Sequence, residues 1–388
     1  MQTPSERSIV HFDLDTFFVS VERQKDSRLE GKPIMVGGSG DRGVVAACSY
    51  EARQFGVRAG MAMRMARRLC PQATIVSGDH QAYTDKSQEI TEIIHERAPL
   101  YEKASIDEFY LDVSGMERFH GTWQWANELR QCILKESGLP ISMGLSVNKL
   151  VSKVAANAAK PNNQLQVPGQ QVLDFLSPMP VSKLPMVGPK TALQLAHMGV
   201  RHVKVLRQIP RPALERAYGK QGTHLYQKAR GQDDSPVTPS SIRKSISTER
   251  TFAADTMDVD FLRTTLIAMV EKLGFQLRQA QRLTGCISVR IRYANFDTVS
   301  KQIRIPFSAR DDELILKALG LFEKLYTRRV RLRLIGVRLS RLAPGHPQLN
   351  LFEPLAKQAD LYVALDRSQL RHGVGIVGRG DPSGMKWS

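Results

Sequence analysis

The 388-residue chain lacks the signals that mark membrane-spanning, secreted and zinc-binding proteins. Its four cysteines include no CxxC pair, so we expect neither a zinc site nor a disulfide framework. No run of about 18 apolar residues predicts a membrane span, and the opening residues MQTPSERS have neither the basic nor the apolar region of a signal peptide. These absences predict a protein of the reducing cytoplasm with no membrane partner.

Acidic residues are scarce relative to basic ones. The chain has 55 Lys and Arg against 38 Asp and Glu, which gives a net charge of +17 and a pI near 9.9. This balance favours phosphate-rich partners, although RNA and membranes would satisfy it as well as DNA. Residues 242–341 hold 20 of the basic and 10 of the acidic residues, so one quarter of the chain supplies more than half of the excess.

Two short motifs about ninety residues apart concentrate acidic residues. HFDLDTFF carries Asp13 and Asp15, and its alternating apolar residues predict a strand with both aspartates on one face. In ASIDEFYLDVSG, Asp107 and Glu108 are adjacent, so both can serve one site only where a hairpin turn or bulge breaks the pleat. Converging carboxylates suit magnesium, and a pair of such ions can align an attacking oxygen with a leaving pyrophosphate. Helix caps or solvated loops explain either motif alone equally well.

Residues 1–165 alternate between the patterns of strands and helices. We expect strands at 34–36, 44–48 and 141–147, and helices at 16–25, 87–97 and 123–136. Asn148 can cap a further helix that Pro161 ends. On that helix Lys149 and Lys153 belong to a polar stripe, for which a solvated face is the ordinary explanation.

Five segments in this region together resemble a known family. In order they are HFDLDTFFVSVE, GKPIMV, VVAACSYEARQFGVRAGM, ASIDEFYLDVSG and GLSVNKLVSKVAANAAKPN. They resemble a Y-family DNA polymerase of the DNA polymerase IV (DinB) type, with SIDE and YEARxFGV as the specific signals, and the resemblance continues more loosely to about residue 342. It implies template-directed addition of deoxynucleotides to a primer 3′-hydroxyl in error-prone translesion synthesis. The chain has no room for a separate proofreading nuclease beside a polymerase core.

The resemblance assigns the catalytic role to Asp13, Asp107 and Glu108. With the main-chain carbonyl of Leu14 they would hold two Mg²⁺ ions, for which Mn²⁺ can substitute. These ions would activate the primer 3′-hydroxyl and stabilise the pyrophosphate. Asp15 is expected only to cap the helix that follows it.

The family's nucleotide-binding positions fall on Phe17, Phe18, Tyr50, Arg53 and Lys160. Tyr50, Arg53 and Lys160 would hold the triphosphate. Phe18 occupies the steric-gate position, where a ring under the sugar leaves no space for a 2′-hydroxyl, whereas Phe17 is also explained as a core residue. Relatives often carry Thr where this chain has Ala47, so one hydroxyl contact to the triphosphate is expected to be missing.

The implied fold is α+β and multidomain: a right-hand polymerase with a ferredoxin-like palm, small fingers, a helical thumb and a C-terminal little-finger sheet domain. The expected boundaries are 1–17 and 78–165 for the palm, 18–77 for the fingers, 166–231 for the thumb, 232–241 for a linker, 242–342 for the little finger and 343–388 for a tail.

Two of these domains are expected to bind DNA. LPMVGPKTA in the thumb resembles a helix-hairpin-helix, which presents backbone N–H groups to phosphate, but Met186 replaces a glycine and predicts strain there. In the little finger, residues 286–293 alternate between apolar and polar, as in a one-sided sheet with a basic open face. A generic α+β domain with solvated arginines remains the alternative. The expected DNA contacts are Gly188, Lys190, Arg243, Lys244, Arg290, Arg292 and Arg338.

The expected tail contains the pentapeptide QLNLF. Gln348, Leu349, Leu351 and Phe352 resemble the bacterial sliding-clamp-binding peptide, although a docking loop would also explain them. The resemblance therefore implies a bacterial, nucleoid-associated monomer that binds primer-template DNA, deoxynucleoside triphosphates and a clamp. The final glycine-rich residues are expected to be poorly ordered.

Other functions share some of these features. A nucleotidyl cyclase also uses paired carboxylates and two metals, but it needs no basic C-terminal sheet. A non-catalytic, clamp-associated DNA-binding protein would explain the charge and QLNLF but would leave Asp13, Asp107 and Glu108 without a purpose. Among polymerases, a deoxycytidyl transferase of the Rev1 type and a polymerase V catalytic subunit are the nearer alternatives.

Overall fold

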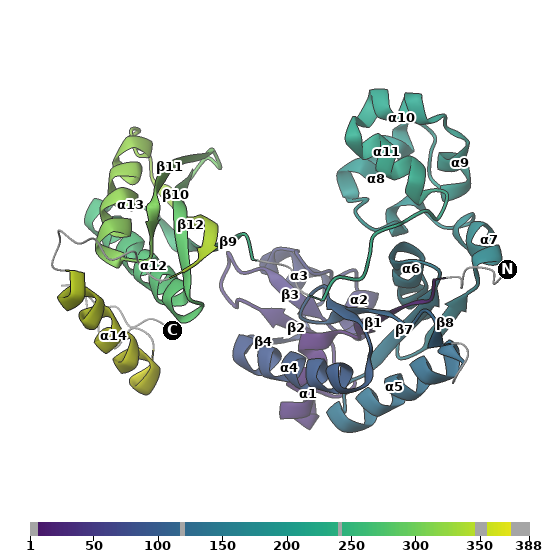
Figure 1. Ribbon diagram of the computed structural model, residues 1–388. Helices are drawn as coiled ribbons and strands as arrows, with labels where there is room; N and C mark the ends of the chain where they lie inside the picture. The colour runs from purple at the N-terminus through teal and green to yellow at the C-terminus, as the bar shows by residue number, and fades with distance from the viewer. Residues whose placement is uncertain (1–6, 117–120, 240–242, 346–354, 374–388) are drawn as a thin grey trace. The chain divides into compact units, whose positions relative to one another are not determined.

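The computed structural model describes residues 7–116, 121–239, 243–345 and 355–373. The chain forms two compact units, Met1–Ser241 and Ile242–Ser388, each with its own sheets and helices (Figure 1). The multidomain α+β expectation is confirmed. Among the described helices, none combines the length and apolarity needed to cross a bilayer.

A five-stranded sheet is the framework of the first unit. Its order is β5 (Tyr101–Lys103), β6 (Glu108–Asp112), β1 (Ile9–Leu14), β7 (Ile141–Ser146) and β8 (Gln164–Val167). The central strand β1 pairs antiparallel with both β6 and β7. Its side chains alternate, so that Val10, Phe12 and Leu14 join the core formed with α4 (His80–Arg97) and α5 (Thr122–Ser137).

The opposite face of this sheet carries α6 (Lys149–Ala159), which packs on β1, β7 and β8. Asn148 caps α6, as expected, by accepting a hydrogen bond from the N–H of Val151, and the helix ends before Pro161. Figure 1 shows α6 on one side of the sheet and α5 on the other. His11 and Asp13 therefore lie on the side of the sheet that α6 covers.

A second, three-stranded sheet has the order β3 (Val45–Cys48), β2 (Ile34–Gly37) and β4 (Thr74–Val76). It has a small core of its own with α2 (Tyr50–Gln54) and α3 (Met63–Leu69). Helix α1 (Phe17–Lys25) and the 3-10 turn η1 (Ser27–Leu29) connect it to the end of β1.

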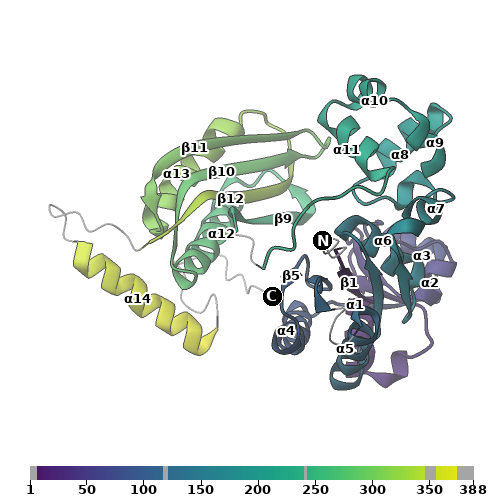
Figure 2. The same ribbon diagram turned by 45° about the vertical axis from the view of Figure 1, so that its right-hand side comes forward.

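Short helices follow the first sheet and share a further core. They are η3 (Gly169–Gln171), α7 (Val172–Leu176), η4 (Val181–Lys183), α8 (Pro189–His197), α9 (Val203–Gln208), α10 (Arg211–Tyr218) and α11 (Lys220–Lys228). Figure 2 shows α8, α9, α10 and α11 gathered beyond α6 and α7.

The expected linker is bound to the first sheet over much of its length. The side chain of Asn148 donates to the carbonyl of Gly231 at 2.7 Å, and Glu102 accepts the N–H of Thr238 at 2.8 Å. Between these contacts Val237 is 5% exposed and packs with Ile9. Residues 231–238 are therefore part of the first unit rather than a free connection.

The second unit is an antiparallel sheet covered by helices on one face. Its order is β11 (Thr298–Ser308), β10 (Arg282–Tyr293), β12 (Leu332–Pro344) and β9 (Ser245–Thr256), with α12 (Val259–Gln279) and α13 (Asp311–Leu325) against it. The alternation expected for β10 is confirmed, because Ile287, Val289, Ile291 and Tyr293 are buried. On the edge strand β11, Ile303 is 38% exposed.

The expected tail contains a helix that the sequence analysis did not predict, α14 (Leu355–His372). It is fixed to α12 and α13 by polar contacts. Asp366 forms an ion pair with Arg278 at 2.9 Å, and the hydroxyl of Tyr362 donates to Asp312 at 2.8 Å. QLNLF and the glycine-rich end lie outside the described residues.

Candidate active site

The carboxylates of the two acidic motifs meet at one end of the first sheet. Asp13 lies directly opposite Glu108 in the pairing of β1 with β6. Asp107 lies in the turn between β5 and β6, and its carbonyl accepts the N–H of Leu14 at 3.0 Å. The expected hairpin turn is thus confirmed, and it lets adjacent residues approach the same end of β1.

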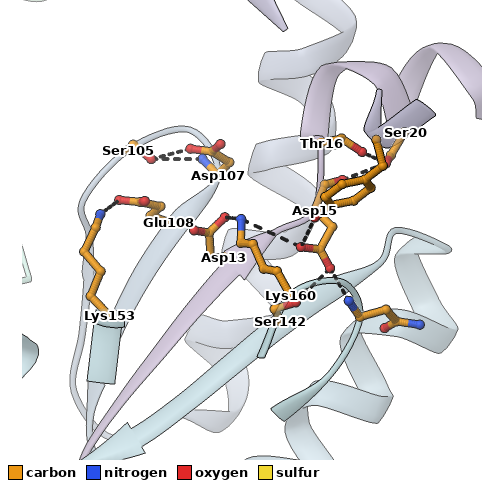
Figure 3. A network of polar contacts seen from close by, with 12 residues as sticks. Asp13, Asp15, Thr16, Ser20, Ser105, Asp107, Glu108, Ser142, Lys153 and Lys160 are labelled. Atoms are coloured by element: carbon orange, nitrogen blue, oxygen red, sulfur yellow. Dashed lines mark hydrogen bonds and ion pairs between the residues drawn. The ribbon is translucent and has the colours of Figure 1, made fainter. Parts of the chain in front are cut away.

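The three catalytic candidates are not equally close in this structure. Ligand atoms of Asp13, Glu108 and the unexpected neighbour His11 lie within 4.8 Å of one another. Asp107 is held in its turn, where its carboxylate accepts the hydroxyl of Ser105 at 2.5 Å (Figure 3). Its charge still contributes to the environment of Asp13. The structure therefore pairs Asp13 with Glu108 and keeps Asp107 beside them.

Lysines from α6 and its C-terminal end neutralise these carboxylates. Lys160 contacts Asp13, and Lys153 contacts Glu108, each with an N–O distance of 2.5 Å. Lys149 pairs with Glu102 at 2.7 Å. The prediction that Lys149 and Lys153 form a solvated face is wrong: their side chains are only 14% and 24% exposed, because this stripe faces the sheet.

Burial changes the acidity of the site. It raises the pKa of Asp13 to about 6, and the charges of Glu108 and Asp107 add to this rise while Lys160 opposes it. Two like charges and desolvation both disfavour a carboxylate anion, so the pairing with Lys160 stabilises it. A divalent cation bound by these oxygens would supply the same compensation, and hard oxygen donors are the type that Mg²⁺ prefers.

The sequence analysis missed His11, although period two places it on the same face as Asp13. The ring is fully buried and lies 4.4 Å from that of Tyr110. Burial lowers its pKa well below the usual value, and the charges of Lys153 and Lys160 add to the effect. His11 is therefore a neutral neighbour of the carboxylates.

Asp15 has a different environment from Asp13. It is 1% exposed, and its carboxylate accepts hydrogen bonds from Tyr50, Ser142 and Asn162. The expectation that Asp15 caps the next helix is wrong, because Thr16 is the N-cap residue of α1.

The two aromatic residues after β1 separate as expected. Phe17 is 4% exposed and belongs to the core, whereas Phe18 is partly exposed and lines a cavity of about 230 Å³ with Ala46, Gly78 and other residues. The Phe18 ring stacks on that of Tyr83 at 4.1 Å with an angle of 10° between the planes.

The remaining triphosphate candidates, Tyr50 and Arg53, lie on the short helix α2. The guanidinium of Arg53 lies 4.9 Å from the ring centre of Tyr50, and Ser49 caps the helix. Burial raises the pKa of Tyr50, and the charge of Asp15 adds to the rise, so its hydroxyl stays protonated. Ala47 on β3 lies opposite Val36, where it offers no hydroxyl.

The expected DNA contacts are divided between the units. Met186 in the hairpin before α8 has φ 65° and is 82% exposed, which confirms the strain predicted for this position. Gly188 is the N-cap residue of α8, and Lys190 lies in its first turn.

In the second unit the expected contacts lie on or next to the sheet. Arg290 pairs with Glu249 at 2.9 Å, Arg292 donates to Thr298, and Arg338 is exposed on the neighbouring strand. Arg243 and Lys244 are exposed just before β9.

Comparisons with known proteins cover both units. Residues 12–157 match the model of the impB/mucB/samB family, residues 243–351 match its C-terminal domain, and residues 182–233 match a thumb domain described for DNA polymerase-iota. DNA polymerase IV of Dehalococcoides mccartyi is 36% identical over 380 residues, which is 97% of each chain. DNA polymerase IV of Halorhodospira halophila is 37% identical over 90% of this chain and 99% of its own. A solved Y-family DNA polymerase chimera is 27% identical with a TM-score of 0.78 and covers 87% of this chain and 100% of its own.

Proposed function

The chain belongs to the impB/mucB/samB family, the Y-family DNA polymerases, and from that membership we propose how its own residues act. It is a DNA-directed DNA polymerase of the DNA polymerase IV type, active in translesion synthesis, with primer-template DNA and deoxynucleoside triphosphates as substrates. A nucleotidyl cyclase, a non-catalytic DNA-binding protein and the other polymerase types are not favoured. The family is metal-dependent. We assign the palm, fingers, thumb and little finger to the residue ranges expected from the sequence, with 232–241 as a connection bound to the first unit and 343–388 as a tail that contains α14.

The observation that carries the catalytic proposal is the pairing of Asp13 with Glu108 at the end of two antiparallel strands. With Asp107 and the carbonyl of Leu14 they would hold two Mg²⁺ ions, or Mn²⁺ in their place. Bound ions would supply charge stabilisation for the attacking 3′-oxygen and for the leaving pyrophosphate. The side chain of Asp13 supports this role because it is buried, ionisable and, among the described residues, paired with a single lysine.

The incoming nucleotide would lie against the start of α2 and α1. Arg53 and Lys160 would neutralise the β- and γ-phosphates, and Tyr50 would donate one hydrogen bond to them. Phe18 would exclude a 2′-hydroxyl, because the stacked ring of Tyr83 gives it a rigid backing. Ala47 removes one hydroxyl contact that relatives often make.

DNA and protein partners would be bound outside this pocket. Gly188 and Lys190 would contact phosphate at the thumb hairpin, and the exposed arginines of the second sheet would bind the duplex backbone. We also propose that the protein is a bacterial, cytoplasmic monomer. It would associate with the nucleoid, where the DNA lies, and bind a sliding clamp through QLNLF.

Primer extension by Asp107→Ala and Glu108→Ala tests the catalytic assignment. Each substitution should abolish extension and leave the dissociation constant for primer-template DNA within about twofold, since neither carboxylate belongs to a basic DNA-binding surface. Asp112→Ala is the matched control, because Asp112 ends the same strand and bonds only locally to Ser114 in the described part of the chain. Full turnover in either active-site variant at saturating Mg²⁺ would refute the assignment.

A further inference from the structure

The carboxylate of Asp15 joins three segments of the first unit. Its Oδ1 accepts the hydroxyl of Tyr50 at 3.2 Å. Its Oδ2 accepts the hydroxyl of Ser142 at 2.8 Å and the backbone N–H of Asn162 at 2.6 Å. These partners come from α2, β7 and the loop after α6, and Figure 3 shows Ser142 beside Asp15.

Two of these segments carry proposed triphosphate ligands. Tyr50 is one of them, and Asn162 lies two residues after Lys160, whose ammonium group is 3.7 Å from Oδ1 of Asp15. Asp15 is therefore connected to Tyr50 through its side chain and to Lys160 through the loop that follows it.

The Asn162 loop is held in an uncommon conformation from two sides. Asn162 has φ 44°, a left-handed value that asparagine tolerates better than most residues. Arg130, which is 4% exposed, donates to its side-chain carbonyl at 2.6 Å, while Asp15 accepts its backbone N–H. If the hydrogen bond to Asp15 were lost, the bond from Arg130 would be the polar contact of Asn162 that remains among the described residues.

We propose that Asp15 is a positioning residue: before the nucleotide binds it fixes the Tyr50 ring by accepting the hydroxyl proton, which turns to the phosphate on binding, and it fixes Lys160 through the Asn162 loop. This inference rests on the proposed function, in which those two side chains bind the β- and γ-phosphates. The two aspartates of the segment Asp13-Leu14-Asp15 would then have different roles. Asp13 keeps an oxygen for a cation, whereas both oxygens of Asp15 accept hydrogen bonds. A charged acceptor suits this task, because hydrogen bonds to an ionised group are shorter and stronger than neutral ones.

Asp15→Asn tests the inference with a change of one atom. The NH₂ group that replaces one oxygen cannot accept a hydrogen bond. Either the bond from Tyr50 or the two bonds from Ser142 and Asn162 are therefore lost. Because a bond to a charged group contributes more than a neutral one, we expect the KM for deoxynucleotides to rise about tenfold to hundredfold. The kcat should change less than threefold, and the dissociation constant for DNA should not change.

A rise in KM with little change in kcat distinguishes a positioning role from a merely structural one. A general loss of folded protein lowers the active fraction, and hence the apparent kcat, but leaves KM unchanged. Ser142→Ala is the milder second variant, because it removes one donor and leaves the carboxylate in place; we expect its KM to rise two- to fivefold. Asp112→Asn is the matched control, with the same chemical change on the neighbouring strand and an unchanged KM.

A double-variant cycle identifies the path of the effect. If Asp15 acts through Tyr50, then Tyr50→Phe should raise KM much less in the Asp15→Asn background than in the wild-type chain. An unchanged KM in both Asp15→Asn and Ser142→Ala, or fully multiplicative effects in the cycle, would overturn the inference. Failure of the proposed function is recognised separately, because then the wild-type chain itself would not extend a primer.

Discussion

Gly144 controls the distance between α6 and the sheet that carries the active-site carboxylates. It lies on β7 opposite His11 of β1, beneath the helix. A Cβ atom placed there would be 2.0 Å from the carbonyl oxygen of Ser152 and 2.5 Å from the backbone N of Ala156. Both are backbone atoms of α6, so no side-chain rotation can relieve the contact.

Gly144→Ala should therefore displace the helix as a body. Ordinary contact with a Cβ begins near 3.4 Å, so α6 must recede by more than 1 Å from its present 2.0 Å contact. Overpacking of this kind costs about 1–3 kcal/mol of unfolding free energy. The same shift moves Lys153 and Lys160 away from Glu108 and Asp13, and a misplacement of about 1 Å can cost on the order of a hundredfold in rate.

Urea unfolding and steady-state primer extension measure the two effects. We expect the urea midpoint of Gly144→Ala to fall and kcat/KM for deoxynucleotides to fall about a hundredfold, with DNA affinity retained. Gly40→Ala is the matched control, since a Cβ at that exposed glycine meets nothing within 4 Å. Wild-type stability and kcat/KM in Gly144→Ala would show that α6 does not hold its lysines in place through this contact.

Four further expectations concern substrate choice and partners. Phe18→Ala should admit ribonucleotides, and an unchanged ratio of deoxynucleotide to ribonucleotide efficiency would mean that another group guards the 2′ position. Removing Arg290 and Arg292 together should flatten the salt dependence of DNA affinity by about one unit for each phosphate that is no longer bound, and an unaltered slope would place the duplex elsewhere. Leu351→Ala with Phe352→Ala should leave unassisted synthesis intact and abolish stimulation by the clamp, whereas full stimulation would identify QLNLF as a chance match. Misincorporation should be readily detected in single-turnover assays, as translesion synthesis by this family implies; undetectable misincorporation would contradict the error-prone assignment.

Period two in the sequence predicted the strand that carries Asp13 but not its end, because β1 stops at Leu14, before Asp15. Alternating apolar residues placed Asp13 on a strand, and the adjacency of Asp107 and Glu108 required a break in the pleat, which the hairpin provides. Both inferences depend on local geometry alone. The same period places His11 on the face of Asp13, but an isolated histidine in an apolar strand does not by itself indicate a chemical role.

The lysines of α6 show what periodicity leaves open. Helical spacing correctly placed Lys149 and Lys153 on one stripe, but a stripe can face either water or a neighbouring element. The choice is made by tertiary packing: Gly144 admits the helix backbone to the sheet, and the carboxylates opposite supply the partners. Lysines more often face solvent, but here acidic residues of the neighbouring strands pair with them.

The expected linker also shows that a sequence pattern does not predict which neighbour a segment packs against. QDDSPVTPSS has the composition of a free connection, and its single apolar side chain near the middle, Val237, gave no periodic signal. Burial of Val237 becomes favourable only because Ile9 and Tyr110 leave an apolar recess beside Glu102 and Asn148. Segments that bind through backbone groups and one anchor cannot be recognised by composition.

Asp13 and Asp15 have the same identity and the same predicted face, yet the structure gives them opposite environments. Strand β1 ends at Leu14, and the N–H of Asp15 already bonds to Pro140 rather than to a strand partner. From there its carboxylate turns to donors 35 to 147 residues away in sequence, all of them neutral hydrogen-bond donors. Asp13 remains in the ladder, opposite Glu108, with a lysine as counter-ion. Asp15 has its lone pairs occupied by three neutral donors, with the Lys160 ammonium farther away at 3.7 Å, and acts as a structural acceptor. Asp13 is compensated by direct contact with that ammonium, which a cation can replace. The distinction between a positioning aspartate and a ligating one therefore lies in the chemistry of their partners.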